Sequence, residues 1–364
     1  RAPAAEIYLS VGTPAGLVTA GDIFAGDRRV RVMAAPLDFG GAAGRAVARI
    51  QPAALVIMET ELWPNLICAA EESGAVVVLA AGRLTERSFR RYSLVRGFMA
   101  SLLSRFDLIG VSGQAEKDMF AALGAPPERL ALFGNPKFDG LLESYGGQDF
   151  RRRTDEWAWK LWGEGPHGPV IVAGSTHPGE EEAALDAFMK AAAFRPELRL
   201  ILAPRHLTRV EEVQGLVKKH GLAPVLSSAA ADQPLLRRAK AAIVDSMGAL
   251  PHLYALATMA IVGGSLREGL MGHNPLEPAA AGTPLMFGPH MKSFAAEAAA
   301  LLAVGGAAET SAGTLARDIE AWLRAPDQAR AAAEAARRHL AERAPAAPAL
   351  AAAVLGLMFN RPLR

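Results

Sequence analysis

Short apolar runs alternate with helix-like segments along the whole chain. In the first part the runs are continuously apolar, and they lie at Ile7–Val11, Val30–Met33, Ala54–Met58, Ala75–Ala80, Leu108–Val111 and Leu130–Phe133. Helix-like segments at 62–72, 89–104 and 115–123 lie between them. Apolar strands of this length, each followed by a helix, predict a parallel sheet covered on both faces. The first part is therefore predicted to be a Rossmann-like α/β domain.

The pattern breaks at 141–168, where glycine, charge and tryptophan are concentrated, and then resumes. The later apolar runs lie at Val170–Ala173, Leu198–Ala203, Ala241–Val244, Met259–Val262 and Leu285–Phe287. We predict a first Rossmann-like domain at 1–140, a linker at 141–168, a second Rossmann-like domain at 169–345, and a helix at 346–364 that can cross back to the first domain. Two such domains would face each other across a ligand-binding cleft.

The stretch 261–290 organises the second domain. A strand ends on Gly263-Gly264, a loop follows, a helix is predicted to open at Asn274, and a second strand ends before Gly288. Glycines allow close approach of backbone to a ligand, and a helix N-terminus attracts anions. Asn274 and Glu277 are also a capping box, which needs no ligand, and both interpretations stay open at this point.

Composition narrows the class of protein. The 364 residues are 51% apolar and 21% charged with a net charge of +2, which fits a folded soluble protein and does not favour nucleic acid. The single cysteine, Cys68, excludes an intrachain disulfide, and the eight histidines show no metal-ligand spacing. We predict no metal, no cofactor and no membrane-spanning run. Because the chain begins at Arg1, we expect a fragment whose anchor or first loop can lie upstream.

Polar residues follow the predicted strands of the second domain. Ser175-Thr176 forms a small-residue turn that could cradle a phosphate, and Arg205-His206 offers a cation that can pair with phosphate or carboxylate. Met247 and Gly248 follow a third strand end. The structural alternatives are an ordinary helix cap for the serine and threonine and a surface salt bridge for the arginine.

Three charged residues stand at strand ends of the first domain. Glu59 and Glu61 follow the strand that ends at Met58, and Lys137 follows the last one. A carboxylate in this place is a candidate general base or acceptor-binding group, and the lysine could bind an anion. Alternatively, both carboxylates cap the next helix and the lysine is solvated.

A segment at 83–98 interleaves arginines with Phe89, Tyr92, Leu94 and Phe98. This composition fits a helix lying on an anionic membrane surface. A solvated basic face over an ordinary core stripe is the alternative that base rates favour.

Eight motifs occur in order along nearly the whole chain. They are Met58–Asn65, Lys137–Asp139, Ser175–Glu181, Pro204–His206, Asp245–Gly248, Gly263–Leu266, Gly272–Pro278 and Gly288–His290. Together they resemble the motif series of the 3-deoxy-D-manno-octulosonic acid (Kdo) transferases. The resemblance implies a GT-B glycosyltransferase that moves Kdo from CMP-Kdo to a lipid A precursor in lipopolysaccharide synthesis, at the cytoplasmic face of the bacterial inner membrane.

The resemblance also implies roles for individual residues. Arg205, Ser175 and Thr176 would meet the CMP phosphate, Met247-Gly248 would line the cytidine, and Asn274 and Glu277 would hold phosphate and ribose. The remaining members of the implied donor set are His206, Gly264, Ser265 and His273. The implied catalytic set is Glu61, Glu59 and Lys137, with Glu61 acting on the acceptor side.

Two departures from the family pattern stand out. Family members carry an upstream anchor and a Ser-Val-Gly-Glu loop whose glutamate is the expected general base, whereas this chain begins at what matches the second strand. The loop 267–272 is one residue longer than expected, with Leu270-Met271 where glycine is usual.

Two alternatives remain: another GT-B enzyme that uses a UDP-sugar, as transferase or epimerase, and a two-lobed small-molecule binding protein. The number of Kdo units, the exact acceptor and the oligomeric state are left open.

Overall fold

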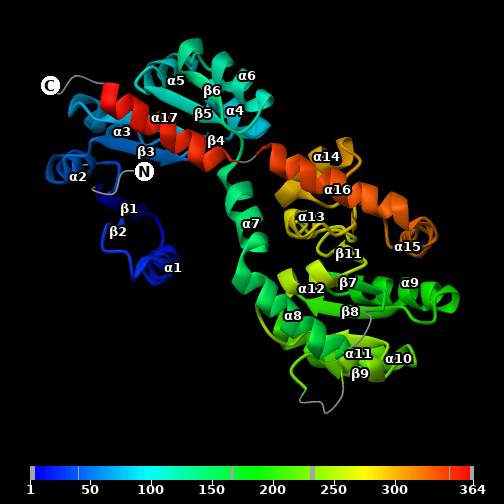
Figure 1. The fold of residues 1–364 in the computed structure, drawn as a ribbon. Coiled ribbons are helices and arrows are strands. Elements are labelled where there is room, and N and C mark those ends of the chain that lie inside the picture. The colour runs from blue at the N-terminus through cyan, green and yellow to red at the C-terminus, as the bar shows by residue number, and fades with distance from the viewer. Residues whose placement is uncertain (1–4, 40, 165–167, 230–233, 344, 361–364) are drawn as a thin grey trace. The chain divides into compact units, whose positions relative to one another are not determined.

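The computed structural model describes residues 5–39, 41–164, 168–229, 234–343 and 345–360. The chain divides into two compact units, one formed by Arg1–Pro136 with Ala346–Arg364 and the other by Lys137–Pro345. In both units parallel strands alternate with helices (Figure 1). The units are described one at a time below.

The strands of the first unit form two parallel sheets. They are β1 (Ile7–Val11), β2 (Val30–Ala34), β3 (Ala54–Met58), β4 (Val76–Gly82), β5 (Leu108–Val111) and β6 (Leu130–Leu132). β1 pairs with β2, and the other four lie in the order β3-β4-β5-β6. The predicted strands are confirmed. The prediction of one continuous sheet is not confirmed, because within the described residues neither β1 nor β2 pairs with β3.

Helices pack against both sheets of the first unit. They are α1 (Pro14–Phe24), α2 (Ala42–Ile50), α3 (Pro64–Glu72), α4 (Glu86–Ser93), α5 (Arg96–Leu103), α6 (Gln114–Ala122), the 3₁₀ turn η1 (Pro127–Arg129) and the C-terminal α17 (Ala346–Asn360). The helix predicted at 89–104 is two helices, because Val95 leaves helical geometry with φ −120° and ψ 37°. Leu350 of α17 packs against Val76, Val78 and Ala80 of β4.

The second unit contains one parallel sheet in the order β13-β12-β11-β7-β8-β10-β9. Its strands are β7 (Val170–Thr176), β8 (Arg199–Pro204), β9 (Pro224–Leu226), β10 (Ala241–Ile243), β11 (Met259–Val262), β12 (Leu285–Phe287) and β13 (Ala308–Glu309). The order changes direction at β7, since the chain next adds strands on the β8 side and later on the β11 side. The carboxyl ends beside such a reversal are where ligands of open α/β sheets bind.

Helices and short 3₁₀ turns connect these strands. They are α7 (Pro136–Gly146), α8 (Gln148–Trp162), α9 (Glu180–Phe194), η2 (Leu207–Arg209), α10 (Val210–Lys219), α11 (Leu235–Arg238), α12 (Leu250–Leu256), α13 (Leu276–Ala281), η3 (Lys292–Phe294), α14 (Ala295–Ala303), α15 (Leu315–Arg324) and α16 (Pro326–Glu342). The segment expected as a linker, 141–168, is mostly helical and belongs to this unit. Leu161 and Trp162 at its end are buried in the unit's core, which explains the difference.

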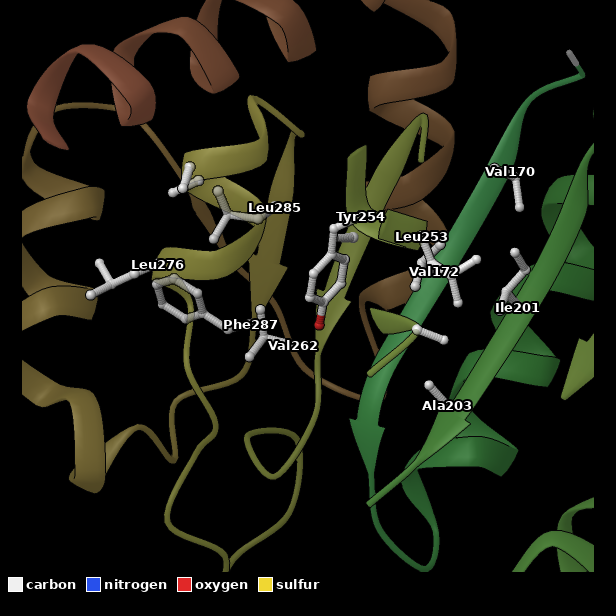
Figure 2. Close-up of a cluster of buried hydrophobic side chains, with 14 of the residues drawn as sticks. Val170, Val172, Ile201, Ala203, Leu253, Tyr254, Val262, Leu276, Leu285 and Phe287 are labelled. Carbon is white, nitrogen blue, oxygen red and sulfur yellow. The ribbon is translucent and has the colours of Figure 1, made fainter. Parts of the chain in front are cut away.

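Each face of the seven-stranded sheet has its own core. Alternate residues of β7, such as Ile171 and Val172, enter opposite clusters. Figure 2 shows one cluster, where Val172 and Ile201 lie on the sheet beside Tyr254. Burying a side chain of this size stabilises a fold by about 1.5–3 kcal/mol. The sheet is therefore a firm support for the loops at its carboxyl edge.

Length and hydropathy alone would allow one stretch, 326–359, to cross a membrane, which the sequence pattern did not predict. This stretch contains two separate helices, α16 and most of α17. Ala336 and Leu340 of α16 lie in the core of the second unit, and Leu350 of α17 lies in a core of the first. Packing within the protein accounts for part of this apolar character, since 24% of the apolar window is buried.

Candidate functional site

Loops at the carboxyl edge of the second unit's sheet bring most of the predicted donor residues together. Because the strands are parallel, the loops after β7, β8, β10 and β11 emerge on one side. The backbone N–H of Arg205 donates to the carbonyl of Thr176 at 2.9 Å, which joins two of these loops. The side chains of His177 and His273 join the loop after β7 to the loop after β11. The predicted positions after β7, β8 and β11 therefore form one cluster.

Glu180 is the centre of the hydrogen bonds that shape this edge. Its carboxylate is 1% exposed and accepts from the backbone N–H groups of Gly264 (2.7 Å), Ser265 (2.9 Å), Leu266 (2.9 Å) and His177 (3.0 Å). A buried carboxylate is tolerated when several donors replace its water. The sequence analysis included Glu180 only within the Ser175–Glu181 motif and gave it no role, because backbone donors from a distant loop leave no sequence signal.

Two glycines of the β11 loop allow this close packing. A side chain on Gly263 would place its Cβ 2.4 Å from the Ser175 carbonyl oxygen. Gly264 has φ +69°, and a Cβ there would lie 2.8 Å from the His273 ring. The Gly-Gly pair is thus explained by backbone contact between loops and by a left-handed conformation, which L side chains rarely adopt.

Ser265 supports the loop from inside. Its hydroxyl donates to the Val262 carbonyl at 2.5 Å and accepts from the Gly288 N–H at 2.8 Å. The residue is fully buried. Both of these hydrogen bonds are internal, so its hydroxyl holds two strand ends together instead of facing a ligand.

Three histidines line the edge beside Glu180. The Nε2 atoms of His177 and His273 are 2.8 Å apart, and the rings of His177 and His206 meet edge to face with centroids 5.9 Å apart. Burial lowers the pKa of His177 and of His273 below the ordinary histidine value. Neither ring is therefore expected to be charged at neutral pH in the free protein.

Arg205 and Thr176 offer polar groups to a ligand. In the part of the chain that the structure describes, the exposed Arg205 guanidinium makes no hydrogen bond or ion pair. The Thr176 hydroxyl is buried and also has no hydrogen-bond partner among the described residues. Ser175, the residue before the last of β7, has φ 56°, a strained value for a non-glycine residue. Strain and unpartnered polar groups of this kind occur where ligands bind.

Asn274 and Glu277 lie at the start of α13. The Asn274 side chain accepts from Leu276 N–H at 3.1 Å and donates to Glu277 at 3.3 Å. The predicted capping box is therefore altered: the helix begins at Leu276, and Glu277 bonds to the amide side chain instead of the backbone. Burial raises the pKa of Glu277.

Glu277→Gln should stabilise the protein more as the pH rises. The pKa of Glu277 is higher in the folded protein than in the unfolded chain, so wild-type stability falls as pH rises from the unfolded value through the folded one. Glutamine keeps the bond to Asn274 and carries no charge. We expect thermal midpoints that coincide near pH 4.5 and separate by pH 8, with the variant higher. The exposed Glu334→Gln should show no such divergence; a constant offset for Glu277→Gln would contradict this prediction.

Met247 and Gly248 border an open cavity of about 420 Å³. Its lining residues are Arg152, Arg153, Glu156, Trp157, Met247, Gly248, Ala249 and His252. The Met247 side chain is 75% exposed, and a ligand could cover it. Helix α8 supplies half of this lining, which sequence reasoning missed because its charged residues read as a linker.

The candidate residues of the first unit follow β3. Glu59 has φ 58°, and Glu61 is exposed. The capping alternative for these two is wrong, because Asp38 caps α3 by accepting from Asn65 N–H (3.1 Å) and Leu66 N–H (2.8 Å). The side chain of Lys137, in the first turn of α7, lies outside the described part of the structure.

The basic segment 83–98 has an apolar surface of its own. Phe89 and Tyr92 pack against the core of the first unit. Leu94 is 86% exposed and Phe98 54% exposed, at the break between α4 and α5. The solvated-face alternative explains the inward residues and leaves these exposed ones unexplained.

No three His, Cys, Asp or Glu side chains within the described residues gather closely enough to hold a metal ion. The carboxyl edge of the sheet presents Arg205, the histidines and backbone N–H groups. Such groups stabilise negative charge on phosphate oxygens.

Known proteins resemble this chain in sequence and in fold. A sequence family described as 3-deoxy-D-manno-octulosonic-acid transferase (kdotransferase) matches residues 1–140. The 3-deoxy-D-manno-octulosonic acid transferase of Haemophilus influenzae is 34% identical over 79% of this chain and 66% of that protein. The protein of the same name from Bordetella pertussis is 32% identical over 83% of this chain and 68% of that protein.

A solved structure shows the fold. The putative UDP-N-acetylglucosamine 2-epimerase from Listeria monocytogenes superimposes with a TM-score of 0.58 at 14% identity, over 98% of both chains. The predicted α/β GT-B fold class is confirmed by this likeness. The chain spans 43% to 68% of the length of five curated relatives that it matches. On this evidence, the chain belongs to the family of 3-deoxy-D-manno-octulosonic acid transferases, with the GT-B glycosyltransferase fold.

Proposed function

We propose that this chain transfers Kdo from CMP-Kdo to a lipid A precursor. Two observations carry the proposal. The Arg205 backbone bonds to that of Thr176 at the strand ends of the second unit, and among the described residues neither the Arg205 guanidinium nor the Thr176 hydroxyl has a hydrogen-bond partner. A cation and a hydroxyl donor in this place suit the phosphate of a nucleotide sugar. The names of the relatives supply the sugar and the nucleotide as candidates.

The donor would lie along the carboxyl edge of the second unit's sheet. We assign the phosphate to Arg205 and Thr176, the cytosine to the cavity beside Met247, and a ribose hydroxyl to Glu277. The acceptor hydroxyl attacks the anomeric carbon of Kdo as the bond from that carbon to the phosphate oxygen breaks. The acceptor's proton goes to a base, and CMP leaves with charge that Arg205 stabilises. Glu61, exposed on the first unit, is assigned to the acceptor side.

The acceptor is a lipid, and the first unit carries a surface suited to a membrane. Exposed Leu94, Val95 and Phe98 lie among the arginines of α4 and α5. Apolar side chains can enter the headgroup region while arginines meet anionic lipids. We therefore propose that the protein works at the cytoplasmic face of the inner membrane.

Thermal midpoints with CMP, UMP and no nucleotide test the donor assignment. Binding to the folded state stabilises by about 2.7 kcal/mol at a hundredfold excess over Kd, so a real site produces a visible shift. We expect a rise with CMP and none with UMP. Arg205→Ala should abolish that rise, while Arg330→Ala, an exposed arginine of α16, should keep it.

The other outcomes identify the alternatives. A rise with UMP alone would favour an enzyme that uses a UDP-sugar, because shared fold does not choose the nucleotide. A rise with CMP but no Kdo transfer by a longer chain would favour a binding protein. No rise with either nucleotide would contradict the donor site.

A further inference from the structure

His177 and His273 form a hydrogen-bonded pair. Their Nε2 atoms are 2.8 Å apart, their ring planes differ by 4°, and their centroids are 5.1 Å apart. Rings stacked face to face cannot bring two nitrogens that close, because their van der Waals surfaces meet first. The two rings therefore point at each other through an N–H···N bond, whose length is normal for a hydrogen bond.

This geometry allows only some protonation states. One nitrogen must donate and the other accept, so the pair is either neutral or carries one extra proton. Two imidazolium rings would turn two N–H groups toward each other and repel. His177 and His273 therefore titrate as a unit.

The surroundings keep the free pair neutral. Burial lowers the pKa of both rings, and the charges of His206 and, for His273, of Arg205 lower it further. The carboxylate of Glu180 acts in the opposite direction. Glu181 and Arg209 also face His177, but they form an ion pair at 2.7 Å whose effects oppose each other.

An anion bound at this edge would favour the protonated form of the His177–His273 pair over the neutral form. The free Arg205 guanidinium lies close enough to affect His273, so a phosphate bound to Arg205 would bring negative charge near the pair. The pair would then hold a proton that it does not hold when the site is empty. It could thus place a second cation beside the phosphate without repelling Arg205 in the free protein.

We propose that binding of a cytidine nucleotide's phosphate is coupled to uptake of one proton by the His177–His273 pair, which makes His177 a further residue of the phosphate site. This inference rests on the proposed donor site in the second unit. Its chemical consequence is a positive charge that is available to the departing phosphate only while the ligand is bound.

Calorimetric titration measures the proton directly. The probe is the methyl ester of CMP, a phosphodiester like the one in CMP-Kdo, which cannot itself take up a proton near neutral pH. Titrations at pH 7.5 in buffers of different ionisation enthalpy should show uptake of about 0.5–1 proton per bound ligand. Kd should weaken by up to about tenfold per pH unit between pH 7 and 8.5.

Variants locate the proton. His177→Gln and His273→Gln should bind the ester more weakly, with heats independent of buffer and a flat pH profile. His220→Gln is the matched control, since that ring follows the end of α10 and bonds to Asp186 of α9 at 3.2 Å. This variant should keep the wild-type proton uptake. Proton uptake is measured on the wild-type protein from its binding heats in different buffers. This part of the test therefore remains valid even if a substituted protein fails to fold.

Each result decides between the two proposals. Ester binding without proton uptake, or uptake that persists in both His177→Gln and His273→Gln, would overturn the coupling and leave the donor site intact. CMP binding without ester binding would also overturn the coupling, since the donor substrate is a diester. Failure of both CMP and the ester to bind would overturn the donor site and this inference with it.

Discussion

Glu180→Ala should lower the free energy of unfolding of the second unit by roughly 3–5 kcal/mol. The substitution removes the acceptor of four backbone N–H groups, three of them on the consecutive residues Gly264, Ser265 and Leu266. Each buried N–H group left without a partner costs about 1–3 kcal/mol. Water that enters the loop can hydrogen-bond to some of these groups, so the total loss is smaller than four times this cost. The free energy of unfolding of Glu180→Gln should lie between those of the wild type and Glu180→Ala, because the glutamine amide has one acceptor oxygen where the carboxylate has two.

Chemical denaturation followed by tryptophan fluorescence measures this effect. Four of the five tryptophans, at 157, 159, 162 and 322, lie in the second unit, so the signal reports mainly on its unfolding. Glu182→Ala is the matched control, since Glu182 is in the same first turn of α9 and is exposed. It should change stability by no more than about 0.5 kcal/mol. Equal effects of the two substitutions would show that Glu180 does not hold the loop.

Gly263→Ala should destabilise the same unit by about 3 kcal/mol or more. The new Cβ would lie 2.4 Å from the carbonyl oxygen and 2.6 Å from the carbonyl carbon of Ser175. These are backbone atoms near the end of β7, which is paired with β11 up to Gly174 and Val262, directly before the contact. No side-chain rotation can relieve the clash, so the strand ends must separate and the turn that carries Thr176 must move.

The control for Gly263→Ala is a glycine with space around it. Gly215 lies within α10, and a Cβ there meets no atom within 4 Å. Gly215→Ala should stabilise the helix by about 0.5–1 kcal/mol, because alanine loses less backbone freedom on folding. The two substitutions thus have opposite expected signs in one denaturation assay. A stabilised Gly263→Ala protein would refute the close approach of the two loops.

The two units and the positions of most strands follow from the sequence alone. A continuous apolar run such as Val76–Gly82 must be buried on both faces. The order of apolar and polar residues within the run itself is enough to predict this burial. The motif series also marked the loops that hold Arg205, His273 and Glu277. These residues are polar groups directly after apolar runs, and parallel strands bring such positions to one edge.

Only the tertiary structure shows which side chains hold those loops in place through hydrogen bonds and which side chains can contact a ligand. Glu180 holds a loop more than eighty residues away, and Asp38, not Glu59 or Glu61, caps α3. His177 finds its partner across a separation of 96 residues. These contacts depend on backbone donors and ring positions that only the packed sheet brings within hydrogen-bonding distance, and no local pattern of residue types encodes a distance in space.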